Sequence, residues 1–170
     1  AFCNMSKPKV ILFAGPIGSS KTPIAYYLSY NLVLPIFNRD AVRVEVREDL
    51  GKLDKEVFEK RARERLEEII DNGLSFILDA SIDRVWDEYK EKFKGYDIFV
   101  ISIDISKKLL KELYQYKGYE IISDRIDRNY QDHLNFLEGY SGIVNLHITD
   151  KDFNKRLTRA LEATEAWYRN

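Results

Sequence analysis

The sequence contains little cysteine, no long apolar run and no excess of charge of one sign. Cys3 is its only cysteine, so an intrachain disulfide and a multi-cysteine zinc site are both excluded. A single cysteine fits a reducing compartment, and we expect a cytoplasmic protein. No apolar run approaches the roughly 20 residues of a membrane span, and no signal peptide is recognisable. We therefore expect no membrane partner.

Charge and length narrow the expectation further. The 27 basic and 28 acidic residues give a net charge of −1, which offers no support for a nucleic-acid partner. A chain of 170 residues with 45% hydrophobic and 32% charged residues is typical of one globular domain with a substantial core. We expect a single domain over residues 1–170. Because Met5 is the only methionine, residues 1–4 are expected to be a remnant ahead of the native start.

Apolar strand-like segments alternate with helix-like segments along the chain. The predicted strands are 10–14, 34–38, 74–78, 98–105 and 143–148. The predicted helices are 21–31, 53–72, 84–93, 107–116, 123–137 and 153–168. This alternation predicts an α/β protein in which a parallel sheet is covered on both faces.

A phosphate-binding pattern follows the first predicted strand. It departs from G-x-x-x-x-G-K-[ST] at one position, where serine replaces the second glycine. Backbone N–H groups that lead into a helix N-terminus bind polyphosphate, the lysine neutralises its β- and γ-phosphates, and the threonine hydroxyl binds Mg²⁺. The alternative is a glycine-rich turn that binds nothing. The candidate nucleotide contacts are Gly15, Pro16, Ile17, Gly18, Ser19, Ser20, Lys21 and Thr22.

The serine at the glycine position raises a conformational question. If Ser20 must adopt a positive φ, it carries a steric cost of about 1–2 kcal/mol that glycine avoids. If its φ is negative, the substitution costs little and adds a hydroxyl donor to the loop.

A carboxylate and an arginine follow the second predicted strand, where ligands of open α/β sheets bind. Asp40 is a candidate base for the proton of a substrate hydroxyl, and Arg43 is a candidate contact to substrate or developing charge. The alternative assigns Asp40 to a helix cap and Arg43 to the surface.

Two further sites carry candidate ligands. Asp79 ends the third apolar run, as does the aspartate that binds Mg²⁺ directly or through water in nucleotide-binding proteins; its alternative role is a cap of the next helix. Arg125 and Arg128 are three residues apart, share a helix face and are candidates to close over the phosphates. Alternatively, they pair with neighbouring aspartates on a wet surface. His133 and His147 are expected to be packed or surface histidines.

Together, residues 15–22, the Asp-x-x-Arg step at 40–43 and the apolar run ending at Asp79 resemble the small P-loop kinases of the nucleoside/nucleotide kinase and zeta-toxin-like group. The resemblance covers residues 9 to about 148. It implies a three-layer αβα P-loop fold with a five-stranded parallel sheet in the order 2-3-1-4-5. It also implies a mobile lid, expected within 117–142, and Mg²⁺-ATP as donor. By this resemblance Asp40 is the base and Arg43 contacts substrate or phosphate.

The chain departs from this group at Ser20 and in the helix 107–117, where lysines and tyrosines stand in place of arginines. A GTPase is disfavoured because the Asn-Lys-x-Asp and Asp-x-x-Gly segments are missing. We expect an ATP-dependent kinase that transfers the γ-phosphoryl group to a hydroxyl or phosphate of a small molecule, with nucleosides and nucleotides among the candidate acceptors. The alternative is a P-loop module that binds nucleotide without catalysis.

Overall fold

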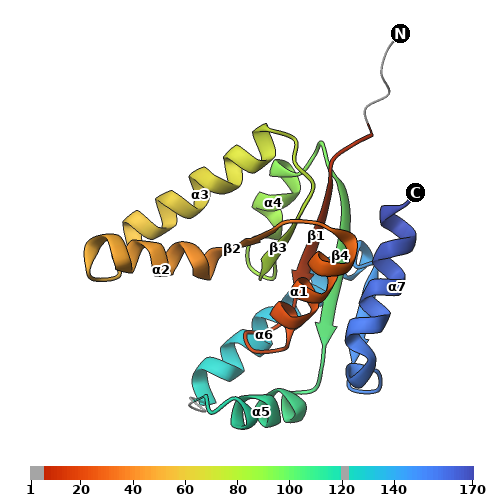
Figure 1. Ribbon diagram of the computed structural model, residues 1–170. Helices are drawn as coiled ribbons and strands as arrows, with labels where there is room; N and C mark the ends of the chain where they lie inside the picture. The colour runs from red at the N-terminus through yellow and green to blue at the C-terminus, as the bar shows by residue number, and fades with distance from the viewer. Residues whose placement is uncertain (1–5, 120–122) are drawn as a thin grey trace.

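A sheet of five parallel strands forms the centre of the molecule in the computed structural model, which describes residues 6–119 and 123–170 (Figure 1). The strand order is β2-β3-β1-β4-β5, which confirms the predicted topology. The strands are β1 (Lys9–Ala14), β2 (Ile36–Asn38), β3 (Phe76–Ser81), β4 (Asp97–Asp104) and β5 (Leu146–Thr149). Because every pairing is parallel, each strand before β5 is followed by a crossover that returns the chain to the end of the sheet where the strands begin.

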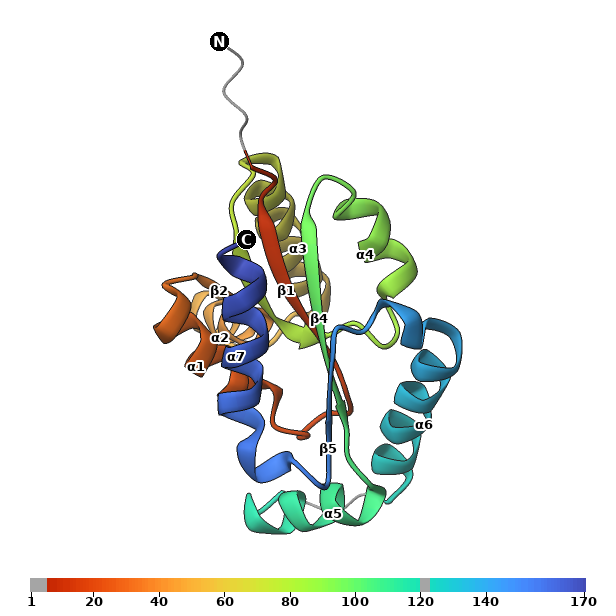
Figure 2. The same cartoon turned by 90° about the vertical axis from the view of Figure 1, so that its right-hand side faces the viewer.

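Helices cover both faces of the sheet, as Figure 2 shows for α1 and α7 on one side and α4 and α6 on the other. The helices are α1 (Lys21–Leu32), α2 (Arg39–Leu50), α3 (Lys55–Asp71), α4 (Trp86–Lys92), α5 (Lys107–Tyr116), α6 (Ser123–Tyr140) and α7 (Arg156–Tyr168). Short 3₁₀ helices, Ser141–Ile143 and Phe153–Lys155, flank β5. Among the residues that the structure describes, no helix is long and apolar enough to cross a membrane.

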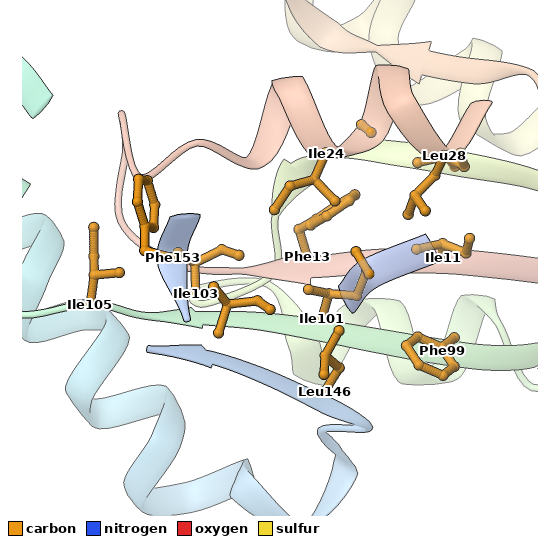
Figure 3. Close-up of a cluster of buried hydrophobic side chains, with 14 of the residues drawn as sticks. Ile11, Phe13, Ile24, Leu28, Phe99, Ile101, Ile103, Ile105, Leu146 and Phe153 are labelled. Carbon is orange, nitrogen blue, oxygen red and sulfur yellow. The ribbon is translucent and has the colours of Figure 1, made fainter. Parts of the chain in front are cut away.

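The side chains of β1 alternate between two cores because successive strand residues point to opposite faces. Ile11 and Phe13 pack with α1 residues such as Ile24 and Leu28, a cluster drawn in Figure 3. The neighbouring β1 residues Val10 and Leu12 pack instead with side chains from α2, α3 and α4. All of these β1 side chains are fully buried, as expected for a central parallel strand.

Helix α2 was not predicted from the sequence. Asn38 caps it by accepting a hydrogen bond from the Asp40 N–H at 2.7 Å. Only Val42 and Val46 are buried along its twelve residues, so its apolar stripe is too thin to stand out from the surrounding charges.

Strand ends also differ from the expectation. β3 continues through Asp79 to Ser81, and β5 begins at Leu146 because the preceding residues form a 3₁₀ turn. Part of the predicted lid, residues 120–122, lies outside the described residues.

An aromatic cluster beneath α4 gives a stability prediction. The Phe93 ring is fully buried, with its centroid 5.4 Å from that of Tyr96, 5.7 Å from Tyr89 and 6.1 Å from Phe76. Phe93→Ala removes this packing and leaves a cavity, which is expected to lower the free energy of unfolding by about 3–5 kcal/mol. Urea denaturation measures the change. Phe93→Leu is the control, because it keeps apolar bulk and should cost clearly less; equal costs would contradict the prediction.

Candidate active site

Residues 15–22 connect β1 to α1 at the carboxyl edge of the sheet, and two glycines in this loop have no room for a side chain. A Cβ on Gly15, whose φ is 143°, would lie 3.0 Å from Ser19 Oγ and 3.1 Å from Ile103 Cβ. A Cβ on Gly18, whose φ is 78°, would overlap the Tyr114 ring. Both positions therefore require glycine for conformation and for space.

Ser20 adopts the left-handed conformation, with a φ of 84° and a ψ of 28°, so the substitution carries the steric cost. Its buried hydroxyl accepts a hydrogen bond from Arg156 Nε at 2.8 Å. A second guanidinium nitrogen of Arg156 donates to the Phe153 carbonyl at 3.0 Å, and the guanidinium lies 4.3 Å from the Phe153 ring centroid. A glycine could not hold Arg156 at this place. The hydrogen bond therefore offsets part of the strain.

The ammonium of Lys21 is enclosed by its own loop. Its Nζ donates to the Gly15 carbonyl at 2.8 Å and to the Pro16 carbonyl at 2.5 Å. Burial lowers the pKa of Lys21 to about 8, against the opposing effect of the Asp83 and Asp79 carboxylates. The lysine charge that would meet phosphate is thus desolvated before any ligand binds.

Thr22 and Asp79 lie together, as a shared magnesium site requires. The Thr22 hydroxyl donates to Asp79 at 3.0 and 3.1 Å, and Asn38 Nδ2 donates to the same carboxylate at 3.1 Å. Burial raises the pKa of Asp79, while the Thr22 hydrogen bond and the Lys21 charge oppose the shift. Hydroxyl and carboxylate oxygens suit Mg²⁺. Within residues 6–119 and 123–170 no group of three or more His, Cys, Asp or Glu side chains could hold a metal. Further ligands would be phosphate oxygens and water.

A cavity of about 730 Å³ opens over this edge of the sheet. It brings together eight of the residues singled out from the sequence, namely Ile17, Gly18, Ser20, Lys21, Thr22, Asp40, Asp79 and Arg125. The cavity is also lined by residues that the sequence did not single out as site residues: Arg39, Tyr114, Lys117 and Tyr119.

Two predicted arginines lie apart from the described cavity lining. Arg43 pairs with Asp40 Oδ1 at 3.0 Å and lies 5.1 Å from the Phe58 ring centroid. Arg128 Nε donates to the Asp124 carbonyl at 3.3 Å on an exposed turn of α6. Arg39, at the start of α2, lines the cavity and pairs with Glu59 at 2.5 Å.

Helix α5 and Lys117, the residue that follows it, contact the loop formed by residues 15–22. The Tyr114 hydroxyl donates to the Ile17 carbonyl at 2.6 Å, and Lys117 Nζ donates to the Gly18 carbonyl at 3.0 Å. Desolvation and the nearby Arg156 charge lower the pKa of Lys117. Tyr114 and Lys117 of this segment therefore contact the loop 15–22, where the resemblance implied arginines.

Comparison with known proteins agrees with this geometry at the level of the fold. No family model matches the chain, and no curated protein matches it either. A gluconokinase from Sinorhizobium meliloti 1021 has a TM-score of 0.68 at 13% identity, with 95% of this chain and 94% of that chain covered. An APS kinase from Mycobacterium tuberculosis has a TM-score of 0.59 at 17% identity, with 94% and 98% covered. A shikimate kinase from Bacteroides thetaiotaomicron has a TM-score of 0.56 at 13% identity, with 92% and 98% covered.

The chain therefore has the fold of the small P-loop kinases, as the sequence resemblance implied. With identities this low, the similarity shows the fold alone. Activity has to be argued from the site itself.

Ser20 gives a prediction about strain. Ser20→Ala keeps the positive φ and loses the Arg156 hydrogen bond, whereas Ser20→Gly loses the same bond and relieves the strain. Ser20→Gly is therefore expected to be more stable than Ser20→Ala by about 1 kcal/mol in urea unfolding. In an Arg156→Gln background the cost of Ser20→Ala should shrink. An Ala variant as stable as the Gly variant would contradict the strain.

Lys21 gives a prediction about pH. Because phosphate favours the ammonium form of a lysine whose free pKa is about 8, affinity for Mg²⁺-ATP should fall as the pH rises through 8. Isothermal calorimetry should show a loss of about fourfold between pH 7 and pH 8.5. Lys21→Arg is the control, because guanidinium stays charged throughout this range. A parent affinity that stays flat across this range would refute the assignment.

Proposed function

We propose that this protein is an ATP-dependent kinase that transfers the γ-phosphoryl group to a hydroxyl or phosphate of a small molecule. One observation carries the proposal: a single cavity is lined by the loop residues Lys21 and Thr22 and by the carboxylates Asp40 and Asp79. A phosphate-binding loop, a metal-ligand pair and a carboxylate that can face an acceptor are the parts that phosphoryl transfer needs. The names of the similar structures, a gluconokinase, a shikimate kinase and an APS kinase, support a small-molecule acceptor.

The donor would occupy the loop side of the cavity. Loop N–H groups and Lys21 would hold the β- and γ-phosphates, as the helix N-terminus of α1 favours anions there. Thr22 and Asp79 would hold Mg²⁺, which neutralises developing charge when bound. Lys117 and Arg125 line the same cavity and add positive charge beside the phosphates.

The acceptor would lie against the start of α2. Asp40 is exposed, lines the cavity and is oriented by its ion pair with Arg43. In this role Asp40 accepts or orients the proton of the acceptor hydroxyl, and Arg43 acts by holding Asp40 in place. Arg39 offers a cation to an acceptor that carries an anionic group. Catalysis would then consist of positioning and electrostatic stabilisation.

A non-catalytic nucleotide-binding module is the second candidate. It is favoured by one observation. Where the usual phosphate loop has glycine, this chain has Ser20, which adopts a strained positive φ. Such a module would use the loop for binding and would have no use for Asp40.

A screen for acceptors tests the proposal directly. ATP consumption is measured with Mg²⁺ against nucleosides, nucleotides, sugars and nucleotide-sugars, and the kinase is expected to consume ATP with at least one of them. No turnover with any acceptor, combined with no measurable ATP binding, would overturn both candidate functions. ATP binding without turnover on any acceptor would favour the module.

Asp40→Asn separates the two candidates once an acceptor is found. The variant is expected to lose turnover by about 10²–10⁴-fold, because a proton acceptor is removed, while the Kd for Mg²⁺-ATP stays within about twofold. Asp49→Asn is the matched control, since Asp49 lies on the same helix and pairs with Arg61. Steady-state rates and calorimetry measure both quantities. Unchanged turnover in Asp40→Asn would remove the proposed role.

A further inference from the structure

A buried histidine on α6 lies between two carboxylates behind the phosphate loop. The His133 side chain is 2% exposed; its Nδ1 lies 3.1 Å from Asp83 Oδ1 and its Nε2 lies 2.9 Å from Asp104 Oδ1. Ionised carboxylates only accept hydrogen bonds, so both ring nitrogens donate when the histidine is an imidazolium. Burial disfavours this charge, but the hydrogen bonds to Asp104 and Asp83 outweigh burial and raise the pKa of His133 to about 9.

Asp83 connects this histidine to the loop. Its side chain is only 6% exposed, and its two carboxylate oxygens accept the Gly15 N–H at 3.1 and 3.3 Å. The carbonyl of the same Gly15 accepts from Lys21 Nζ. The first residue of the loop is therefore held through its N–H by Asp83 and through its carbonyl by the lysine.

Asp104 anchors the other side of the histidine. It lies at the end of β4, accepts a hydrogen bond from Ser102 Oγ at 2.5 Å and contacts the His147 ring on β5. The imidazole of His133 also stacks on Phe136, with centroids 6.3 Å apart and 14° between planes. The hydrogen bond to Asp104 and the stacking on Phe136 fix the His133 ring, so its charge has a defined position relative to Asp83.

We propose that His133 is a positioning residue of the nucleotide site: its ring donates a hydrogen bond to Asp83 and holds that carboxylate in place, and Asp83 in turn fixes Gly15 and leaves Lys21 free for phosphate. This role rests on the proposed function, in which residues 15–22 bind a polyphosphate. The proposal gives a role to His133, which is far from residues 15–22 in the sequence.

The charges around the network explain why loss of the imidazolium matters. The groups that face it are Asp83 after β3, Asp104 on β4, His147 on β5 and, beyond Asp83, Lys21 on α1. Lys21 also interacts electrostatically with Asp83. Without His133, Asp83 would lose a charged hydrogen-bond donor and would draw the lysine charge away from phosphate. Anion binding would then weaken.

Binding of pyrophosphate tests the proposal without a phosphoryl acceptor and without the nucleobase of ATP. His133→Gln is expected to bind pyrophosphate about tenfold more weakly than the parent at pH 7 by calorimetry, because a charged hydrogen-bond partner of buried Asp83 is removed. His147→Gln is the control: it removes the histidine that contacts Asp104 alone, and its affinity should stay within about twofold of the parent. Equal binding by His133→Gln and the parent, or an equal loss in both variants, would overturn the proposal.

A spectroscopic measurement covers the case in which His133→Gln fails to fold. The chain has two histidines, so His147→Gln leaves one imidazole signal for NMR titration. The His133 midpoint is expected near 9, as its raised pKa indicates. It should rise by about half a pH unit when pyrophosphate binds and draws Lys21 away from Asp83. A purely structural histidine would keep the same midpoint with and without pyrophosphate, and that result would refute the role.

The two proposals can fail separately. If the parent binds no pyrophosphate, the proposed function is overturned and this role is lost with it. If the parent binds pyrophosphate and the His133 midpoint does not move, only the role of His133 is overturned.

Discussion

All five strands run parallel, so every strand ends at the same edge of the sheet and every following segment starts there. This constraint brings Gly18 after β1, Asp40 after β2, Asp79 in β3 and Lys117 after α5 to one cavity, although they are far apart in sequence. The two apolar cores, one on each face of the sheet, hold the strands in place and so fix the positions of the residues at their ends. Chemistry at the site therefore depends on sheet topology before it depends on any single side chain.

Partly desolvated positive charge is the second organising feature of this edge. Lys21 and Lys117 direct their ammonium groups at loop carbonyls, and Arg156 directs its guanidinium at Ser20 and Phe153. Within residues 6–119 and 123–170, no carboxylate forms an ion pair with any of these three cations, and the acceptors hold them at the loop. Desolvation lowers the pKa of Lys21, Lys117 and Arg156. Binding of an anion would therefore stabilise the charged forms of these side chains. Such an arrangement is preorganised for phosphate.

Sequence reasoning predicted the sheet order and the phosphate loop because both follow from local patterns. The loop lies in eight consecutive residues, and strand order followed from the resemblance that those residues support. The missed features depend on long-range contacts: Arg156 reaches Ser20 across 136 residues and Lys117 reaches Gly18 across 99. No local pattern marks such partners. The roles of Asp40, Arg43 and Arg125 remain predictions, although the structure shows where these side chains lie.

The serine in the loop has a consequence for motion. A glycine at this position samples many backbone conformations, and ordering it on a ligand costs entropy. Ser20 has fewer conformations available, and its hydroxyl is tied to the first residue of the C-terminal helix. The number of backbone conformations open to the loop is therefore reduced when the protein folds, so less conformational entropy is lost when a ligand binds. A shift of the loop away from α7 would break this hydrogen bond, so the last helix of the chain stabilises the position of the first loop.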